Sequence, residues 1–338
     1  MPASEPDPRR TKVTVVDVAR LAGVSPMTVS RALNKPEAMP LATVQRVQDA
    51  VAKLGYVRNL MAGGLRSQRS NLVAAVFPSL AGPVFLECID ALNTNLLQRG
   101  YHLIVCQGGY GETNEDELLA DVLGRRPDAI VVTGTSRSTA SQRLLLSAGI
   151  PVLEIWDLSS DPIDMLIGFS HEAIGGAVAK FLAGTGRRRL ALIGGEDERS
   201  RRRWQSFRDR AIDLGLPTPM ARFVPAPARL GYGRAALREL LAETPEIDGV
   251  FCSSDLMAMG VLIEARALGR TVPGDLGVVG FGDLNFAADL EPALTTVRVS
   301  ATRIGQLAAE TLAQRLQGVS PPERLIDVGF EVVRRASA

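Results

Sequence analysis

Cysteine and histidine are scarce in this chain of 338 residues. The three cysteines, Cys88, Cys106 and Cys252, are scattered and odd in number, so they form neither a metal-ligand spacing nor a disulfide framework. We expect each to be a small buried hydrophobic residue in a protein of a reducing compartment. His102 and His171 have no cysteine spaced to complete a site with them, and His171 is expected to cap a helix or lie at the surface. Neither a metal nor another cofactor is therefore expected.

Long apolar runs and the glycine-rich loops of common enzymes are also missing. No run of about 18 apolar residues occurs, which argues against a membrane span. Residues 1–12 lack the apolar core of a secretory signal, so a cytoplasmic protein is expected. The sequence contains neither a G-x-x-x-x-G-K-S/T phosphate loop nor a G-x-S-x-G nucleophile elbow. These absences argue against an enzyme.

Charge is distributed unevenly along the chain. Residues 1–70 carry 11 Lys or Arg and 5 Asp or Glu, whereas the other 268 residues carry 27 and 32. The formal net charge of +1 thus combines a basic N-terminal part with a mildly acidic remainder. A small basic part favours a polyanionic partner.

The basic part begins with the pattern of a short capped helix at residues 15–22. Thr14 and Asp17 occupy the two positions of a capping box, and Gly23 follows as a left-handed turn residue. A second helix starts directly after this glycine, and a third, at 41–54, has one apolar face. A helix, a tight glycine turn and a second helix form a helix-turn-helix.

The second helix carries polar side chains crowded at its start. Ser25 is a natural N-cap, and Pro26 suits the first helical position. In a helix-turn-helix this end faces DNA, so hydroxyls would meet phosphates, Met27 a thymine methyl, and Arg31 a guanine or a phosphate. The alternative is a plain three-helix bundle with a solvated polar face. The expected DNA contacts from this helix are Ser25, Pro26, Met27, Thr28, Ser30 and Arg31.

The remainder alternates between apolar runs and amphipathic segments. Strand-like runs lie at 72–77, 102–106, 129–134, 151–156, 189–195, 249–254 and 276–281. Helical patterns lie between them, for example at 85–99, 171–183, 204–214, 231–242, 256–267 and 301–316. This alternation predicts an α/β body with parallel sheets, long enough for two doubly wound lobes with a cleft between them. We divide the chain into a helix-turn-helix domain at 1–56, a linker at 57–70 and an effector-binding and dimerisation body at 71–338.

With these motifs the sequence resembles the LacI family of bacterial transcription regulators. VTVVDVARLAGVSPMTVSRALN and LGYVRN are similar to the family's N-terminal signature, and FPSLAGPVF, DGVFCSSDLMAMGVL, VPGDLGVVGFGD and PALTTVRV to its body. DER at 197–199 and DVGF at 327–330 resemble the subgroup that represses gluconate utilisation. The resemblance implies a dimeric or tetrameric repressor of a near-palindromic operator, with Asn34 and Tyr56 among its DNA contacts.

The resemblance also implies that the linker folds into a hinge helix on DNA. Asn59 would start this helix, Ala62 would pack against its twin, and Leu65 would wedge a base step open in the minor groove. Arg58 stands where the family usually has proline, and the adjacent Gly-Gly pair costs a helix about 1 kcal/mol per glycine relative to alanine. We therefore expect a hinge that orders only on DNA, with a flexible tether as the alternative.

Members of this family bind a small-molecule effector between the two lobes of the body, and this body resembles periplasmic sugar-binding proteins. Arg203 matches the arginine that the family uses against its effector, and Phe85 would stack on a sugar face. Gly282 stands where many sugar-binding members carry an aspartate. The expected effector-binding residues are Phe77, Ser79, Phe85, Asp157, Phe169, Arg199, Arg203, Ser254, Asp255 and Asp283.

The segment EDERSRRRW at 196–204 bears on the charge of the effector. It concentrates four arginines, and arginine forks pair with carboxylate or phosphate. If two of them face the cleft, the effector is an anionic sugar acid such as gluconate, whereas a solvated helix start is the alternative. A neutral sugar, a corepressor and an activating role remain open. A sugar-transport binding protein is disfavoured, because the sequence shows no export signal and has a DNA-binding pattern.

Overall fold

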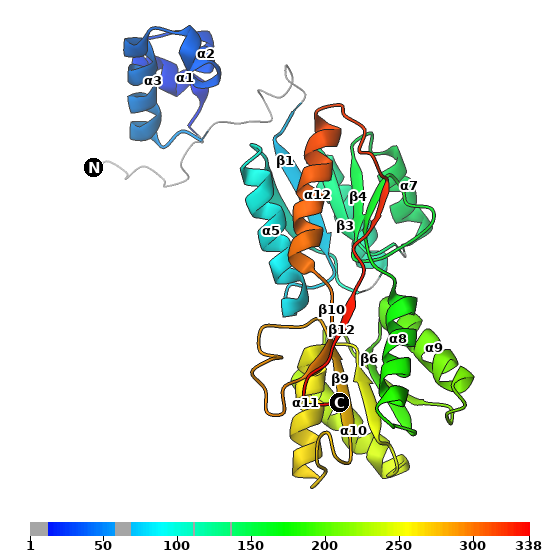
Figure 1. The fold of residues 1–338 in the computed structure, drawn as a ribbon. Coiled ribbons are helices and arrows are strands. Elements are labelled where there is room, and N and C mark those ends of the chain that lie inside the picture. Colours follow the sequence, from blue (N-terminus) through cyan, green and yellow to red (C-terminus); the bar gives the residue numbers. More distant parts are fainter. Residues whose placement is uncertain (1–12, 58–68, 111, 136) are drawn as a thin grey trace, which may run out of the picture. The chain divides into compact units, whose positions relative to one another are not determined.

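The structure, a computed structural model, describes residues 13–57, 69–110, 112–135 and 137–338. The chain forms two compact units that divide between Ser70 and Asn71 (Figure 1). None of the helices that the structure describes has the length and apolarity needed to cross a membrane.

The first unit is a small bundle of helices. Its elements are α1 (Val15–Ala22), α2 (Pro26–Asn34), the 3-10 turn η1 (Pro36–Ala38) and α3 (Leu41–Leu54). The predicted capping box at Thr14 and Asp17 is confirmed, and Gly23 adopts the left-handed conformation with φ 65°. Val18, Val29 and Val47, one from each helix, are fully buried together. Local capping and one apolar stripe per helix thus account for this unit.

The first lobe of the second unit is built on a six-stranded parallel sheet. Its strands are β1 (Leu72–Phe77), β2 (His102–Gln107), β3 (Ala129–Thr133), β4 (Val152–Ile155), β5 (Met165–Gly168) and β11 (Leu325–Asp327), in the order β11-β5-β4-β3-β1-β2. Its helical elements are η2 (Pro83–Phe85), α5 (Leu86–Leu97), α6 (Glu112–Gly124), α7 (Thr139–Ser147) and α12 (Ala301–Leu316). Figure 1 shows α12 beside α5.

The second lobe repeats this arrangement. Its strands are β6 (Leu190–Gly195), β7 (Met220–Val224), β8 (Gly249–Cys252), β9 (Gly277–Phe281), β10 (Thr295–Arg298) and β12 (Glu331–Val333), in the order β12-β10-β9-β8-β6-β7. Only β12 runs antiparallel to its neighbour among these described strands. The helices are α8 (His171–Gly184), α9 (Glu198–Asp213), α10 (Leu230–Glu243) and α11 (Asp255–Ala267). The predicted architecture of two doubly wound lobes is confirmed.

The chain passes between the lobes three times, after β5, after β10 and after β11. The two lobes also share an apolar core, because one cluster of buried residues contains side chains from both sheets. Cys88 and Cys252 are fully buried and Cys106 is half-buried, and all three are free thiols. The seven predicted strands are present, whereas β5, β7, β10, β11 and β12 were not predicted.

Helices α8 and α9 approach each other closely at one glycine. A Cβ atom added to Gly175 would lie 2.1 Å from the backbone oxygen of Arg203, whereas one added to Gly176 meets only ordinary contacts at 3.9 Å. A side chain at residue 175 would therefore force the two helices apart.

We expect Gly175→Ala to lower the free energy of unfolding by about 1–3 kcal/mol, the usual cost of overpacking. The adjacent Gly176→Ala is the matched control, and we expect it to stabilise the protein by about 0.5–1 kcal/mol because alanine is the better helix former. Urea unfolding of both variants measures the difference. Equal stability of the two variants would contradict the close approach of α8 and α9.

Candidate functional site

A pocket opens between the two lobes where strands of both sheets end. Its empty volume, which includes the open mouth, is about 780 Å³. Ser79 follows β1, Trp156 follows β4 and Ser254 follows β8, so the carboxyl ends of parallel strands supply the walls. The residues that line the pocket include Ser79, Phe85, Tyr110, Trp156, Asp197, Arg199, Ser200, Arg203, Ser254, Phe281 and Leu284.

Half of the residues expected to bind an effector line this pocket. They are Ser79, Phe85, Arg199, Arg203 and Ser254. The other five lie behind the lining or beside it, and they are Phe77, Asp157, Phe169, Asp255 and Asp283.

Aromatic rings support the pocket from behind. The Phe85 and Trp156 rings on the lining are 5.0 Å apart between centroids in an edge-to-face arrangement. Phe77, which is fully buried, lies 5.5 Å from the Phe85 ring, and Phe169, also fully buried, lies 5.7 Å from the Trp156 ring. Phe77 and Phe169 therefore hold lining residues in place.

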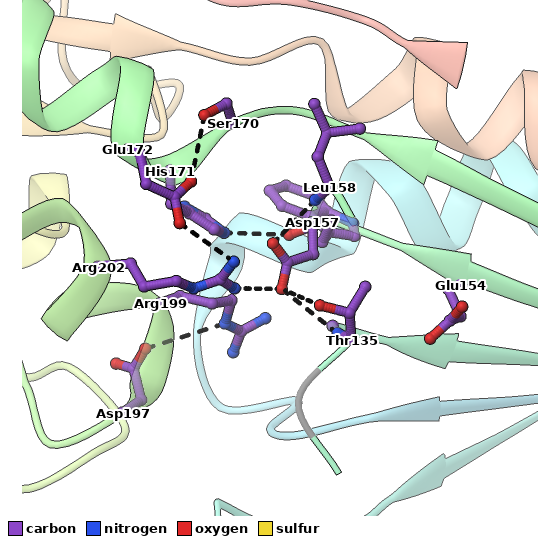
Figure 2. A network of polar contacts seen from close by, with 12 residues as sticks. Thr135, Glu154, Asp157, Leu158, Ser170, His171, Glu172, Asp197, Arg199 and Arg202 are labelled. Atoms are coloured by element: carbon purple, nitrogen blue, oxygen red, sulfur yellow. Dashed lines mark hydrogen bonds and ion pairs between the residues drawn. The ribbon is translucent and has the colours of Figure 1, made fainter. Parts of the chain in front are cut away.

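Asp157 links the two lobes. It follows β4 in the first lobe, and its carboxylate contacts the guanidinium of Arg202 on α9 of the second lobe (Figure 2). Thr135 donates to the same carboxylate from its hydroxyl at 3.0 Å. Arg202 also lies 3.5 Å from Glu172 near the start of α8. The ion pair ties the first lobe to the helix that carries Arg203.

Asp255 and Asp283 hold the loop that follows β9. Asp255 is fully buried, and its carboxylate accepts a hydrogen bond from the backbone nitrogen of Leu284 at 2.7 Å. Burial raises the pKa of Asp255 to about 6. Asp283 lies 2.6 Å from Arg298 and 2.7 Å from Arg335. Since Leu284 is a lining residue, both acids shape the pocket through this loop.

Arg203 reaches the pocket from α9 and is 4% exposed. Its guanidinium donates to Nδ1 of His171 at 2.8 Å and to the Ser200 hydroxyl at 3.1 Å, and it lies 4.6 Å from the centroid of the Phe281 ring. Its Nε has no hydrogen-bond partner within the described ranges, and no carboxylate there lies within ion-pair distance. Burial lowers the pKa of Arg203 to about 10, and nearby Asp197 opposes this shift.

Arg199 is the second arginine of the lining. Its Nε lies 3.9 Å from a carboxylate oxygen of Asp197, and its guanidinium lies 5.8 Å from the centroid of the Phe85 ring. Asp197 itself caps α9, because its carboxylate accepts from the backbone and hydroxyl of Ser200 at 2.9 and 2.8 Å. The carboxylate is thus mainly engaged in capping.

The expectation for His171 was wrong. Ser170, not His171, caps α8, because the Ser170 hydroxyl accepts from the backbone nitrogen of Ala173 at 3.0 Å. His171 is only 2% exposed and lies between the two lobes, with Nε2 3.1 Å from the backbone oxygen of Trp156. A residue at the first position of a helix points inward here because α8 begins where the chain passes between lobes.

Trp156, Phe281 and Tyr110 line the pocket but were not predicted to bind an effector, although the sequence carries a signal for the first two. Trp156 and Phe281 end the predicted runs at 151–156 and 276–281, so the strand-end rule that selected Ser79 would have selected them too. Tyr110 follows β2 after two glycines and has no comparable signal. Tyr110 lines the pocket because the two lobes pack against each other, and no local sequence pattern encodes that packing.

In the first unit, α2 presents the residues expected to contact DNA. Ser25, Pro26, Met27, Ser30 and Arg31 are exposed and Thr28 is half-buried, with Met27 at 78% exposure. The Ser25 hydroxyl accepts from the backbone nitrogen of Thr28 at 3.1 Å, which confirms the predicted cap. The first turn of α2 is therefore accessible to a partner, as the predicted DNA contacts require.

The remaining expected DNA contacts lie at the end of α2 or beyond this helix. The Asn34 side chain donates to the backbone oxygen of Ser30 at 2.7 Å at the end of α2. Tyr56 packs against the core of the first unit. The hinge residues Asn59, Ala62 and Leu65 lie outside the described residues.

A helix-turn-helix unit joined to a two-lobed body with a small-molecule pocket defines the class of ligand-responsive DNA-binding regulators. The family model "Bacterial regulatory proteins, lacI family" matches residues 14–59, and "Periplasmic binding protein-like domain" matches residues 179–338. The chain therefore belongs to the lacI family of bacterial regulatory proteins, and it is a DNA-binding transcriptional regulator rather than an enzyme.

Individual relatives agree with this assignment over nearly the whole chain. The HTH-type transcriptional regulator GntR of Pseudomonas aeruginosa is 36% identical over 326 residues, which cover 96% of this chain and 95% of that protein. A LacI-family regulator from Silicibacter pomeroyi superposes with a TM-score of 0.90 at 32% identity, covering 96% and 99% of the two chains. A complex of the regulator CelR with cellobiose superposes with a TM-score of 0.70 at 27% identity, covering 96% and 100%.

Proposed function

We propose that this protein is a homodimeric repressor whose operator affinity is controlled by a sugar acid such as gluconate. The observation that carries the proposal is Arg203, a buried cation in the pocket with no carboxylate partner among the described residues. An uncompensated buried charge is costly, and an anionic ligand would supply the missing partner.

The rest of the lining supports the same ligand class. Two arginines and one aspartate are the charged residues that the structure places on the lining, and Asp197 is occupied in capping α9. The hydroxyls of Ser79 and Ser254 offer partners for a polyol, and the Phe85 ring offers an apolar surface for its carbon chain. The resemblance to the gluconate-utilisation subgroup points to the same class.

A neutral sugar is the second candidate effector. The CelR–cellobiose complex shows that a related fold holds a neutral disaccharide. In that case Arg203 would donate to hydroxyl groups, and its charge would remain uncompensated in the complex.

Calorimetric titration with gluconate, glucose and cellobiose separates the two candidates. We expect gluconate alone to bind and, at about 100 times its Kd, to raise the free energy of unfolding by about 2.7 kcal/mol. Fluorescence anisotropy on operator DNA should then show release on adding gluconate, whereas tighter binding would indicate a corepressor. Binding of neutral sugars with none of gluconate would refute the sugar-acid proposal.

A further inference from the structure

His171 stands between the effector-facing arginine and the first lobe. Its Nδ1 lies 2.8 Å from Nη1 of Arg203, and its Nε2 lies 3.1 Å from the backbone oxygen of Trp156. A guanidinium can only donate and a carbonyl oxygen can only accept. Nδ1 must therefore be the acceptor and Nε2 must carry the proton, so both contacts are satisfied by one form, the neutral Nε2–H tautomer.

The surroundings of the ring favour the same neutral form. The imidazole lies 4.9 Å from the Phe169 ring and 6.5 Å from the Phe281 ring, between centroids, and is excluded from water. The charged groups that face it are the guanidinium groups of Arg203, Arg199 and Arg202. Burial, followed by these three cations, holds the pKa of His171 well below its usual range.

Arg203 differs in its partners from Arg137 and Arg202, the half-buried arginines that bridge to carboxylates at the end of β4 and just beyond it. Arg137 lies 2.7 Å from Glu154, and Arg202 contacts Asp157, so both are compensated by a carboxylate. Arg203 is oriented by hydrogen bonds to a ring nitrogen and a hydroxyl, and neither partner carries negative charge.

We propose that His171 is a positioning residue that fixes the Arg203 guanidinium without neutralising it, and so sets the preference of the pocket for anionic ligands. The histidine also ties the arginine to the first lobe, because Trp156 supplies both the accepting carbonyl and a pocket-lining side chain. This inference rests on the proposed function, in that the pocket takes an anion.

The substitutions His171→Asn and His171→Asp form a pair of nearly equal shape that differs in charge. In His171→Asn, the asparagine Oδ1 replaces Nδ1 as a neutral acceptor. We expect the Kd of this variant for gluconate to stay within about fivefold of the wild-type value. In His171→Asp, the aspartate would form an ion pair with Arg203. We expect the Kd of this variant for gluconate to rise by about 30-fold, which is equivalent to losing one charged hydrogen bond. Equal Kd values for gluconate in the two variants would overturn the inference and leave the proposed function standing.

Nuclear magnetic resonance of the ligand-free protein tests the inference independently of any effector. The chain has only two histidines, so ring-¹⁵N labelling with His102→Asn as the assignment control isolates the His171 signal. We expect the Nε2–H tautomer, without titration between about pH 5.5 and 8. A titrating ring or the other tautomer would overturn the positioning role. The expected tautomer combined with no gluconate binding by the wild type would refute the sugar acid, not the arrangement of His171 and Arg203.

Discussion

Replacing Arg203 with methionine will weaken gluconate binding by about 100-fold or more, while operator binding by the first unit is retained. Truncating one partner of a buried, hydrogen-bonded charge pair usually costs about 2–5 kcal/mol, and the carboxylate of the ligand would be left buried against an apolar side chain. Calorimetry with gluconate and anisotropy with operator DNA measure the two effects. The variant protein should remain on the operator at gluconate concentrations that release the wild type.

The same substitution should stabilise the protein in the absence of ligand. Burial lowers the folded-state pKa of Arg203 to about 10, below its ordinary value, so the unfolded chain binds this proton more tightly. The resulting penalty on stability is complete at any pH below about 10 and decreases only as the pH rises above that value. Methionine removes this burial penalty but leaves His171 without a hydrogen-bond donor. We therefore expect the free energy of unfolding, measured in urea at pH 7, to rise by about 1 kcal/mol.

Arg201→Met is the matched control for both effects. Arg201 precedes Arg203 by two residues on α9, is exposed, and lies 5.0 Å from the centroid of the Phe223 ring outside the pocket. We expect unchanged gluconate binding and a stability change within about 0.5 kcal/mol. If Arg203→Met were less stable than Arg201→Met by more than about 1 kcal/mol, Arg203 would be a structural residue rather than a ligand-binding one.

The second large effect concerns operator recognition by α2. We expect Met27→Ala and Arg31→Ala each to lower operator affinity by about 10- to 100-fold, because a single base contact contributes about 1–3 kcal/mol. Both side chains are exposed, so the thermal stability of the first unit should not change. Anisotropy titrations on the operator and on random duplex measure the loss, and an unaltered affinity in both variants would exclude α2 as the recognition helix.

Salt dependence separates the two roles left open for Arg31. If the guanidinium contacts a phosphate, Arg31→Ala should weaken binding to all sequences and reduce the slope of log K against log salt by about 1. If it contacts a guanine, the loss should be confined to the operator and specificity should relax at one base pair. Arg208→Ala removes one arginine from α9 of the body and serves as the control for net charge.

Sequence reasoning succeeded where a structure depends on neighbouring residues. The caps at Thr14 and Ser25 and the left-handed turn at Gly23 involve contacts within a few residues, and all three are present. Most of the buried strands were predicted from their apolar runs, but β5, which is buried along its length, and β10, whose first three residues are buried, were not. By contrast, β7 is half-buried along its length and β11 is partly exposed, so neither has the apolar run of a central strand.

The pocket was predictable in kind but not in detail. Arg203 and Ser79 could be selected from motif and strand end, and both line the pocket. Asp157 and Phe169 satisfy the same rules, yet one joins the lobes and the other supports Trp156 from behind. Their roles depend on which side of a strand end faces the other lobe, a property that no local pattern encodes.

The sequence by itself therefore determined the helix-turn-helix, the two-lobed α/β body and the concentration of arginine near the start of α9, because these follow from periodicity, capping and composition. Only the tertiary structure decided that Arg203 is buried without a carboxylate and held by a neutral His171. These residues are 32 positions apart in the chain and meet because α8 and α9 pack together at Gly175. The balance between burial cost and available partners, which sets the charge of the pocket, exists only once that packing is formed.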